Sequence, residues 1–344
     1  MNKITSWIKG HQVTAFFIIT FAITWGLGFS YDALKDPGKF LLIPIGFIAT
    51  CGPALAGIIV TAVSNTQPRQ GTSKAQWIAF LGALIVSTIV FLAHNTIVNH
   101  APLSIVLVGF ILISVIPVAF VISATYSRIP AVKSYLVSLI RLRGILGWAL
   151  LALVLLPGLA LLSIPINSII GRQPITALSL PITGLALIGW IAVKFLYQFC
   201  FFNATGEEVG WRGFALPRLQ AQTSPLIASL VLSFFWAIWH FFYYQAQGEP
   251  VFTWQYWLEV YVDLVPFALL ITWLYNRSKG SILVAGIAHA ASNTAVLALL
   301  PSLDSHVLTA TNFVAALMLV VIDRMWKKLP SDYPTVYREP ALQG

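Results

Sequence analysis

The chain has 344 residues, of which 58% are apolar and only 9% are charged, and its formal net charge is +9. An ordinary soluble domain has about 25% charged residues, which it needs to cover its surface. The composition therefore excludes a soluble globular protein, a disordered chain and a secreted disulfide scaffold. It predicts an all-α, polytopic membrane protein.

Ten apolar segments are each long enough to be a membrane-spanning helix, since one span takes about 20 residues. Because cytoplasmic loops collect Lys and Arg, the basic residues predict the orientation. Only Lys35, Lys39 and Arg172 fall in outer loops and Lys194 falls inside a span. We therefore expect a multi-pass protein of a bacterial plasma membrane, with about ten transmembrane helices and both termini in the cytoplasm. In chain order the segments lie near 12–30, 40–64, 77–93, 104–126, 144–165, 179–202, 224–243, 255–276, 282–300 and 307–323.

The densest group of ionisable residues lies at 205–212, in the sequence TGEEVGWR. Thr205 and Glu208 have the spacing of a capping box, which predicts that a helix begins at Thr205. Glu208 and Arg212 have the spacing of a helical ion pair. Glu207 is left without a local partner, and a carboxylate in apolar surroundings can take and release a proton near neutral pH. The alternative is a salt-bridged helix start at the cytoplasmic surface, which explains Glu207 less well.

Two later apolar segments each contain a histidine. His240 lies in the segment 224–243, and His289 lies in the segment 282–300 on the same helix face as Asn293, four residues later. A lone histidine inside a membrane is often only a hydrogen bond between helices. Two histidines, an asparagine on the same face and a spare glutamate favour a functional site instead.

The spacing around Pro225 supports this interpretation. Proline cannot continue the preceding helix, so a turn is expected at 222–225. In the resulting antiparallel hairpin, Glu207 and His240 lie at the same level. The first arm of this hairpin is too long for one straight span, so we expect a kink or a break near 203–206.

These residues resemble the motifs of the CAAX-prenyl-protease and bacteriocin-processing (CPBP, or Abi) family. The family motifs read Glu-Glu-x-x-x-Arg, Phe-x-x-x-His and His-x-x-x-Asn or Asp. The first motif is complete as Glu207, Glu208 and Arg212, and the third is complete as His289 and Asn293. The resemblance covers roughly 200–300 and does not extend to the first five spans.

The second motif departs from the family pattern, because the aromatic residue four positions before His240 is Trp236 and not Phe. An aromatic side chain is kept, so the departure concerns the shape of the pocket more than its chemistry. On this basis we divide the chain into N-terminal transmembrane helices (1–178), a CPBP-like catalytic core (179–325) and a cytoplasmic tail (326–344).

The resemblance implies an intramembrane endopeptidase that cuts a membrane-embedded or lipidated, CAAX-like substrate. Its glutamate would activate water with the help of one histidine, and the other histidine and the asparagine would stabilise the oxyanion. The implied catalytic residues are Glu207, His240, His289 and Asn293, and the supporting residues are Glu208, Arg212 and Trp236.

A metal is left open by the sequence. Glu207, His240 and His289 match the ligand set of a catalytic zinc site. However, the chain has no His-Glu-x-x-His motif, and asparagine is a poor zinc ligand. We favour a glutamate mechanism without a cofactor over a zinc-dependent one. The expected partners are a peptide or lipidated protein substrate and membrane lipids, and not nucleic acid.

Other charged residues within the spans leave two further functions open. Lys194, Glu259 and Asp263 are compatible with an ion-coupled transporter, although we prefer to interpret them as a Lys–carboxylate pair between helices. His94 falls in a predicted outer loop and is expected to be solvated. A non-catalytic membrane scaffold or immunity protein is the remaining alternative.

Overall fold

The computed structural model describes residues 3–34, 36–170, 183–300 and 305–338, and within these ranges all regular elements are helices. The first nine α-helices are α1 (Lys3–Gly10), α2 (Gln12–Gly26), α3 (Ile43–Thr50), α4 (Gly52–Ser64), α5 (Lys74–Ala93), α6 (Ile105–Ser114), α7 (Ile116–Ser123), α8 (Pro130–Leu136) and α9 (Leu146–Ile169). The later ones are α10 (Leu185–Gln198), α11 (Leu216–Gln222), α12 (Pro225–Trp239), α13 (Phe241–Gln247), α14 (Trp254–Arg277), α15 (Ile282–Thr294) and α16 (Ser305–Ile322). Short 3-10 and π segments are η1 (Gly28–Leu34), η2 (Pro37–Leu42), η3 (His94–Val98), η4 (Ala124–Tyr126), η5 (Val137–Leu139) and η7 (Ala295–Leu299), and a longer π-helix is η6 (Phe199–Ala215).

Each of the ten apolar segments corresponds to a helix or to a pair of helices. Among the described residues, six helices are long and apolar enough to cross a membrane, or up to eight if the bent pairs α3–α4 and α12–α13 each count as one span. The remaining two segments form shorter apolar helices, Gln12–Gly26 and Ile282–Leu297. The all-α membrane bundle is confirmed, and the count of ten crossings stays a prediction. Lys35, Arg172 and the start of the segment 179–202 lie outside the described residues.

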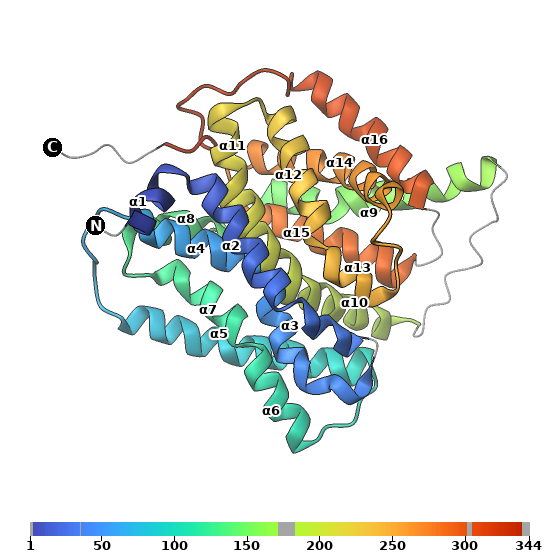
Figure 1. Ribbon diagram of the computed structural model, residues 1–344. Coiled ribbons are helices and arrows are strands. Elements are labelled where there is room, and N and C mark those ends of the chain that lie inside the picture. Colours follow the sequence, from blue (N-terminus) through green and yellow to red (C-terminus); the bar gives the residue numbers. More distant parts are fainter. Residues whose placement is uncertain (1–2, 35, 171–182, 301–304, 339–344) are drawn as a thin grey trace.

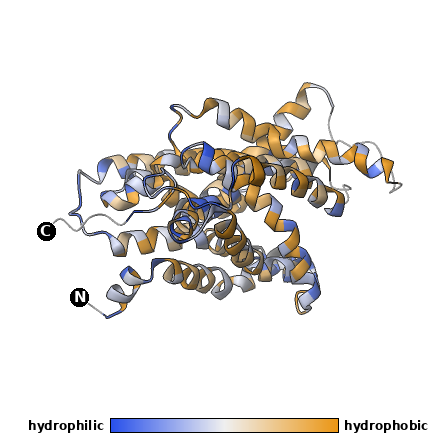
Figure 2. Cartoon of the chain, turned by 90° about the horizontal axis from the view of Figure 1, so that it is seen from above, coloured by the Kyte–Doolittle hydropathy of each residue, from blue (hydrophilic) through white to orange (hydrophobic). Residues whose placement is uncertain are grey.

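The outer surface of the bundle is apolar, as a lipid-facing surface requires. Ile105, Leu185 and Phe252 are 89%, 86% and 82% exposed. Figure 2 shows hydrophobic residues along most of the length of the helices, whereas hydrophilic residues gather at helix ends and in connections. In contrast, Glu208 and Arg212 are fully buried. The polar groups of the motifs therefore lie inside the bundle.

The two ends of the described chain lie at the same end of the bundle. Arg218 Nε donates a hydrogen bond to Gln12 Oε1 at 2.9 Å, and its guanidinium carbon lies 3.8 Å from the ring centroid of Tyr337. An even number of membrane crossings produces such an arrangement. That this end faces the cytoplasm remains a prediction.

The motif glutamates lie on a long helix that crosses the centre of the bundle from Leu185 to Gln222 (Figure 1). The helix continues without a break through 203–206, where it has π geometry, and the alternative of a kink there stays a prediction. The prediction that a helix begins at Thr205 is wrong. The Thr205 hydroxyl donates to the Cys200 carbonyl, five residues earlier, which is the spacing of a π turn. The predicted turn at 222–225 is confirmed, since α11 ends at Gln222 and α12 begins at Pro225.

Small residues allow η6 to pack very closely against α4 and α15. A Cβ atom at Gly210 would lie 2.5 Å from the backbone carbonyl carbon of Pro53, and one at Gly286 would lie 2.6 Å from Cβ of Ala204. Glycine at these positions lets helix backbones approach each other, as is common between membrane helices. The N-terminal helix α4 thereby supports one side of η6, and α15 supports another.

Two expectations about charged residues are wrong. Asp263 accepts a hydrogen bond from Thr309 Oγ1 at 2.7 Å, and within the described ranges neither it nor Glu259 pairs with Lys194. His94 is buried and stacks on Tyr197, with 3.7 Å between the ring centroids. Both errors arise because sequence spacing does not report which helices become neighbours.

Candidate active site

Trp236 is the residue around which the motif side chains gather. It lies on α12, which begins where the Ser224 hydroxyl accepts a hydrogen bond from Ile227 N. The Trp236 side chain is 1% exposed, and its indole Nε1 donates to Glu207 Oε2 at 2.7 Å. The aromatic residue at which the sequence departs from the family pattern therefore binds the candidate base directly.

Glu207 is buried on η6 and is held only by uncharged groups. Besides Trp236 at one oxygen, Asn203 Nδ2 lies 3.5 Å from the other oxygen, Oε1. Among the described residues, Glu207 forms no ion pair. A carboxylate that no cation neutralises keeps its capacity to accept a proton, which is what a general base requires.

The neighbouring carboxylate has the opposite environment. Glu208 Oε1 accepts from Arg212 Nη1 at 2.9 Å and lies 2.8 Å from His289 Nδ1. The predicted pair between Glu208 and Arg212 is present, but both side chains are fully buried and not at a surface. Because two basic groups share its oxygen, Glu208 is suited to holding helices together and not to accepting a proton.

The two histidines approach the same indole ring. The ring centroid of His289 lies 5.3 Å from that of Trp236, and the centroid of His240 lies 6.3 Å from it. His240 is half-buried at the point where α12 bends by 46° into α13, and its Nδ1 lies 2.9 Å from the Trp236 carbonyl oxygen. In both histidines Nδ1 is engaged, which fixes the ring and leaves Nε2 for another partner.

Asn293 is the predicted catalytic residue that the structure does not connect to the others. It lies one turn beyond His289 on α15 and is half-buried, and it makes no hydrogen bond to the site residues of the described chain. Sequence reasoning missed Asn203, whose position four residues before Glu207 could have indicated it. It also missed Phe267, whose ring centroid lies 5.2 Å from that of His289. Phe267 carries no signal, because one more aromatic residue in an apolar span is unremarkable in the sequence.

The candidate zinc ligands do not fit a metal site. In the part of the chain that the structure describes, no three His, Cys, Asp or Glu side chains are arranged so that they could hold a metal ion. Glu207, His240 and His289 each contact Trp236. His289 uses Nδ1 for Glu208, so only its Nε2 is open to another partner. No step of the chemistry below therefore passes through a metal.

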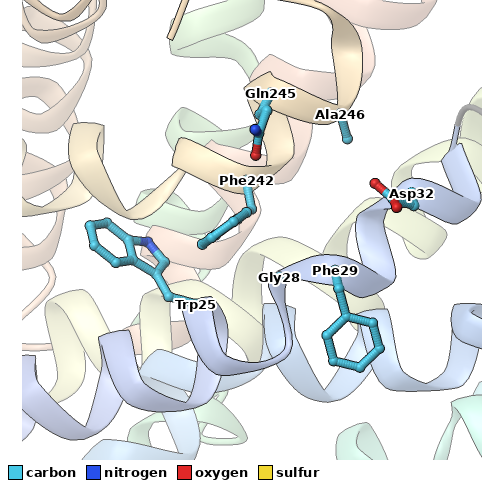
Figure 3. A pocket seen from close by; sticks show the side chains of 7 residues that line it. All are labelled: Trp25, Gly28, Phe29, Asp32, Phe242, Gln245 and Ala246. Atoms are coloured by element: carbon cyan, nitrogen blue, oxygen red, sulfur yellow. The ribbon is translucent and has the colours of Figure 1, made fainter. Parts of the chain in front are cut away.

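A pocket of about 380 Å³ borders α13, the helix that follows His240 (Figure 3). Phe242 lines it two residues after His240, and η1 comes very close to α13 here. A Cβ atom at Gly28 would lie 2.4 Å from Phe242 Cγ, so only glycine fits. The pocket walls come from three elements, α2, η1 and α13, through Trp25, Gly28, Phe29, Asp32, Phe242, Gln245 and Ala246.

Comparison with known proteins agrees with this geometry. Residues 188–295 match the family described as type II CAAX prenyl endopeptidase Rce1-like, and this range contains all seven motif residues. This segment belongs to the CPBP family. The motif resemblance is thereby confirmed, and α1 to α9 lie outside the matched CPBP segment.

A curated relative of the CPBP segment is CAAX prenyl protease 2 of Methanococcus maripaludis. The two chains are 31% identical over 127 residues, which are 35% of this chain and 47% of the relative. The chain therefore spans about half the length of the curated relative that it matches. The matching family model is described as an endopeptidase family.

Proposed function

We propose that this protein is an intramembrane endopeptidase in which Glu207 activates a water molecule. The substrate would be a peptide that is embedded in the membrane or carries a CAAX-like lipidated end. The observation that carries the proposal is the contrast between two adjacent buried carboxylates. Glu208 is neutralised by Arg212 and also contacts His289, whereas Glu207 has only the neutral donors of Trp236 and Asn203.

The reaction needs one base and at least one donor to the oxyanion. Glu207 takes a proton from water while the water oxygen forms a bond to the peptide carbonyl carbon. The carbonyl oxygen becomes negative, and donors that are fixed in a dry site stabilise this charge. Glu207 then gives the proton to the peptide nitrogen, so that the C–N bond breaks and both products are neutral at the reacting atoms.

The histidines have distinct roles in this scheme. Glu208 fixes His289 through Nδ1, so that Nε2 can donate to the oxyanion when it carries a proton. His240 is fixed by the Trp236 carbonyl and assists Glu207 with the water. Asn293, one turn from His289, would add a second oxyanion donor once substrate is bound. The roles of the two histidines rest on the resemblance and on their common contact with Trp236, and the role of Asn293 rests on the resemblance alone.

The division of the chain is proposed from the positions of the motifs along the sequence. Residues 179–325 would form the catalytic core, and 1–178 would supply supporting helices such as α4, which packs against η6. Residues 326–344 would form a cytoplasmic tail. The membrane would be the plasma membrane of a bacterium, and the excess of basic residues on one side supports the proposed orientation of the chain across it.

The test compares the purified wild-type protein with Glu207→Gln on a prenylated peptide and on a transmembrane peptide. Glutamine keeps the shape and can still accept from Trp236, but it cannot take a proton, so turnover should fall by about 10²–10⁴-fold. Glu259→Gln, a substitution outside the site, is the matched control and should be as active as the wild type. Equal turnover by Glu207→Gln and wild type would refute the assignment. If function in cells survives Glu207→Ala combined with His240→Ala, the protein is a non-catalytic scaffold.

A further inference from the structure

A second pocket lies between the start of α9 and the end of α14, and none of the motif residues lines it. It has a volume of about 340 Å³, and its walls come from the connection before α9 and from the residues that end α14. Four of the eight lining side chains are basic, and none is acidic. The lining residues are Arg141, Arg143, Gly144, Ile145, Trp148, Arg277, Ser278 and Lys279.

The positive charge of this pocket is largely uncompensated. Arg277 Nε lies 3.0 Å from Asp323 Oδ2. Within the described ranges, no acidic side chain pairs with Arg141, Arg143 or Lys279, and all three are exposed. Like charges around one small cavity repel each other unless an anion occupies it. The charge pattern therefore calls for an anionic ligand.

The backbone adds hydrogen-bond donors to the same cavity. Helix α9 begins after Ile145 without any side-chain cap, so the N–H groups of its first turn have no partner inside the helix. Such a helix start favours a phosphate or another anion. Gly144 and Lys279 have φ angles of +78° and +58°, so left-handed turns shape both walls of the pocket.

The surroundings place this pocket at the boundary between lipid and water. Leu142 and Leu146, which flank the lining segment, are 74% and 72% exposed, and Trp148 lies half-buried in the wall. The pocket is also at the end of the bundle where the chain termini meet, since Tyr333 Oη donates to the Asn276 carbonyl at 3.4 Å. The positive-inside rule assigns this end to the cytoplasmic leaflet, which carries the anionic lipids.

From the joint placement of these features we propose that the pocket formed by Arg141, Arg143, Arg277 and Lys279 is a binding site for a phosphate-bearing anion. The source that fits best is the headgroup of an acidic phospholipid, because apolar side chains next to the pocket would contact its acyl chains. The site is separate from Glu207 and its neighbours, so it does not depend on the peptidase proposal.

The test measures lipid retention by the full-length protein. The protein is reconstituted in bilayers of phosphatidylcholine with a minor share of phosphatidylglycerol, and native mass spectrometry counts the lipids that stay bound. The pocket variant combines Arg141→Gln, Arg143→Gln and Lys279→Gln. The control variant has the same change of charge at the same end, through Lys133→Gln, Lys327→Gln and Lys328→Gln.

We expect the wild type and the control variant to retain phosphatidylglycerol in preference to phosphatidylcholine. In the pocket variant this preference should fall by about tenfold or more, since losing even one hydrogen bond to a charged phosphate changes the affinity by roughly that factor. A charge-preserving variant, Arg141→Lys with Arg143→Lys and Lys279→Arg, should keep the preference. That result would attribute the loss in the pocket variant to the missing charges and not to a change in folding at these positions. Equal losses in the pocket and control variants, or no loss in either, would overturn the proposal.

Inorganic phosphate distinguishes the two sources of the same chemical group. If phosphate in millimolar excess leaves the bound phosphatidylglycerol in place, the lipid headgroup is supported as the ligand. Phosphate could instead displace the lipid from the wild type, while the pocket variant no longer binds phosphate. That result would support the same site with soluble phosphate as its ligand.

Discussion

The substitution Trp236→Phe isolates the role of a single N–H group. Phenylalanine is the residue that the family motif has at this position, so an aromatic ring remains while the hydrogen bond of 2.7 Å from the indole to Glu207 Oε2 is lost. A hydrogen bond to a charged group contributes about 1.5–3 kcal/mol. If half of this energy holds the carboxylate in its productive orientation, kcat falls about 3- to 13-fold.

The assay is turnover of a prenylated peptide, with kcat and KM determined separately. Trp236 is not expected to contact the substrate, so KM should change little while kcat falls. Trp273→Phe is the matched control, because its indole also donates to a carboxylate, that of Asp323, at the far end of α14. An unchanged kcat for Trp236→Phe, with a loss of thermal stability like that of the control, would show that Trp236 only packs.

Three further predictions concern the packing that supports the site and its independence of zinc. Glu208→Gln leaves the fully buried Arg212 without a counter-ion, so the unfolding free energy should fall by about 3–5 kcal/mol. An unchanged midpoint of thermal unfolding in detergent would contradict this prediction. Gly210→Ala forces a Cβ atom against the backbone of Pro53 and should cost about 1–3 kcal/mol, whereas Gly189→Ala, with nothing within 4 Å of the new Cβ, should be neutral. Dialysis against a zinc chelator should leave turnover unchanged, and a loss that added zinc restores would refute the mechanism without a metal.

Local patterns predicted much of the bundle. The ten apolar segments appear as helices or bent helix pairs because the length of an apolar run is a property of the local sequence. The turn before Pro225 follows in the same way from the covalent structure of proline. Of the kink or break expected near 203–206, the break is absent, because a polar, glycine-containing stretch can also continue as a π-helix when neighbouring helices pack against it.

The ionisable residues inside the spans show which contacts follow from local sequence spacing and which depend on tertiary packing. The position of Glu208 relative to Arg212 is fixed by the helical repeat, so the sequence indicates their ion pair. Asp263 and His94 were interpreted wrongly, because their partners Thr309 and Tyr197 belong to helices that only packing brings close. Whether an ionisable side chain is buried, and what it pairs with, cannot be known before its neighbouring helices are known.

The sequence alone determined that the protein is a helical membrane bundle and that its motif residues occur in the order of the CPBP family. Only the tertiary structure decided that His289 also contacts Glu208, because the two residues are 81 positions apart in the sequence. It also decided that Trp236 contacts Glu207 from another helix. The physical reason is that the side chains of successive helical residues point in different directions around the helix axis. Each of them therefore faces a different neighbouring helix, and close packing through residues such as Gly210 selects that neighbour.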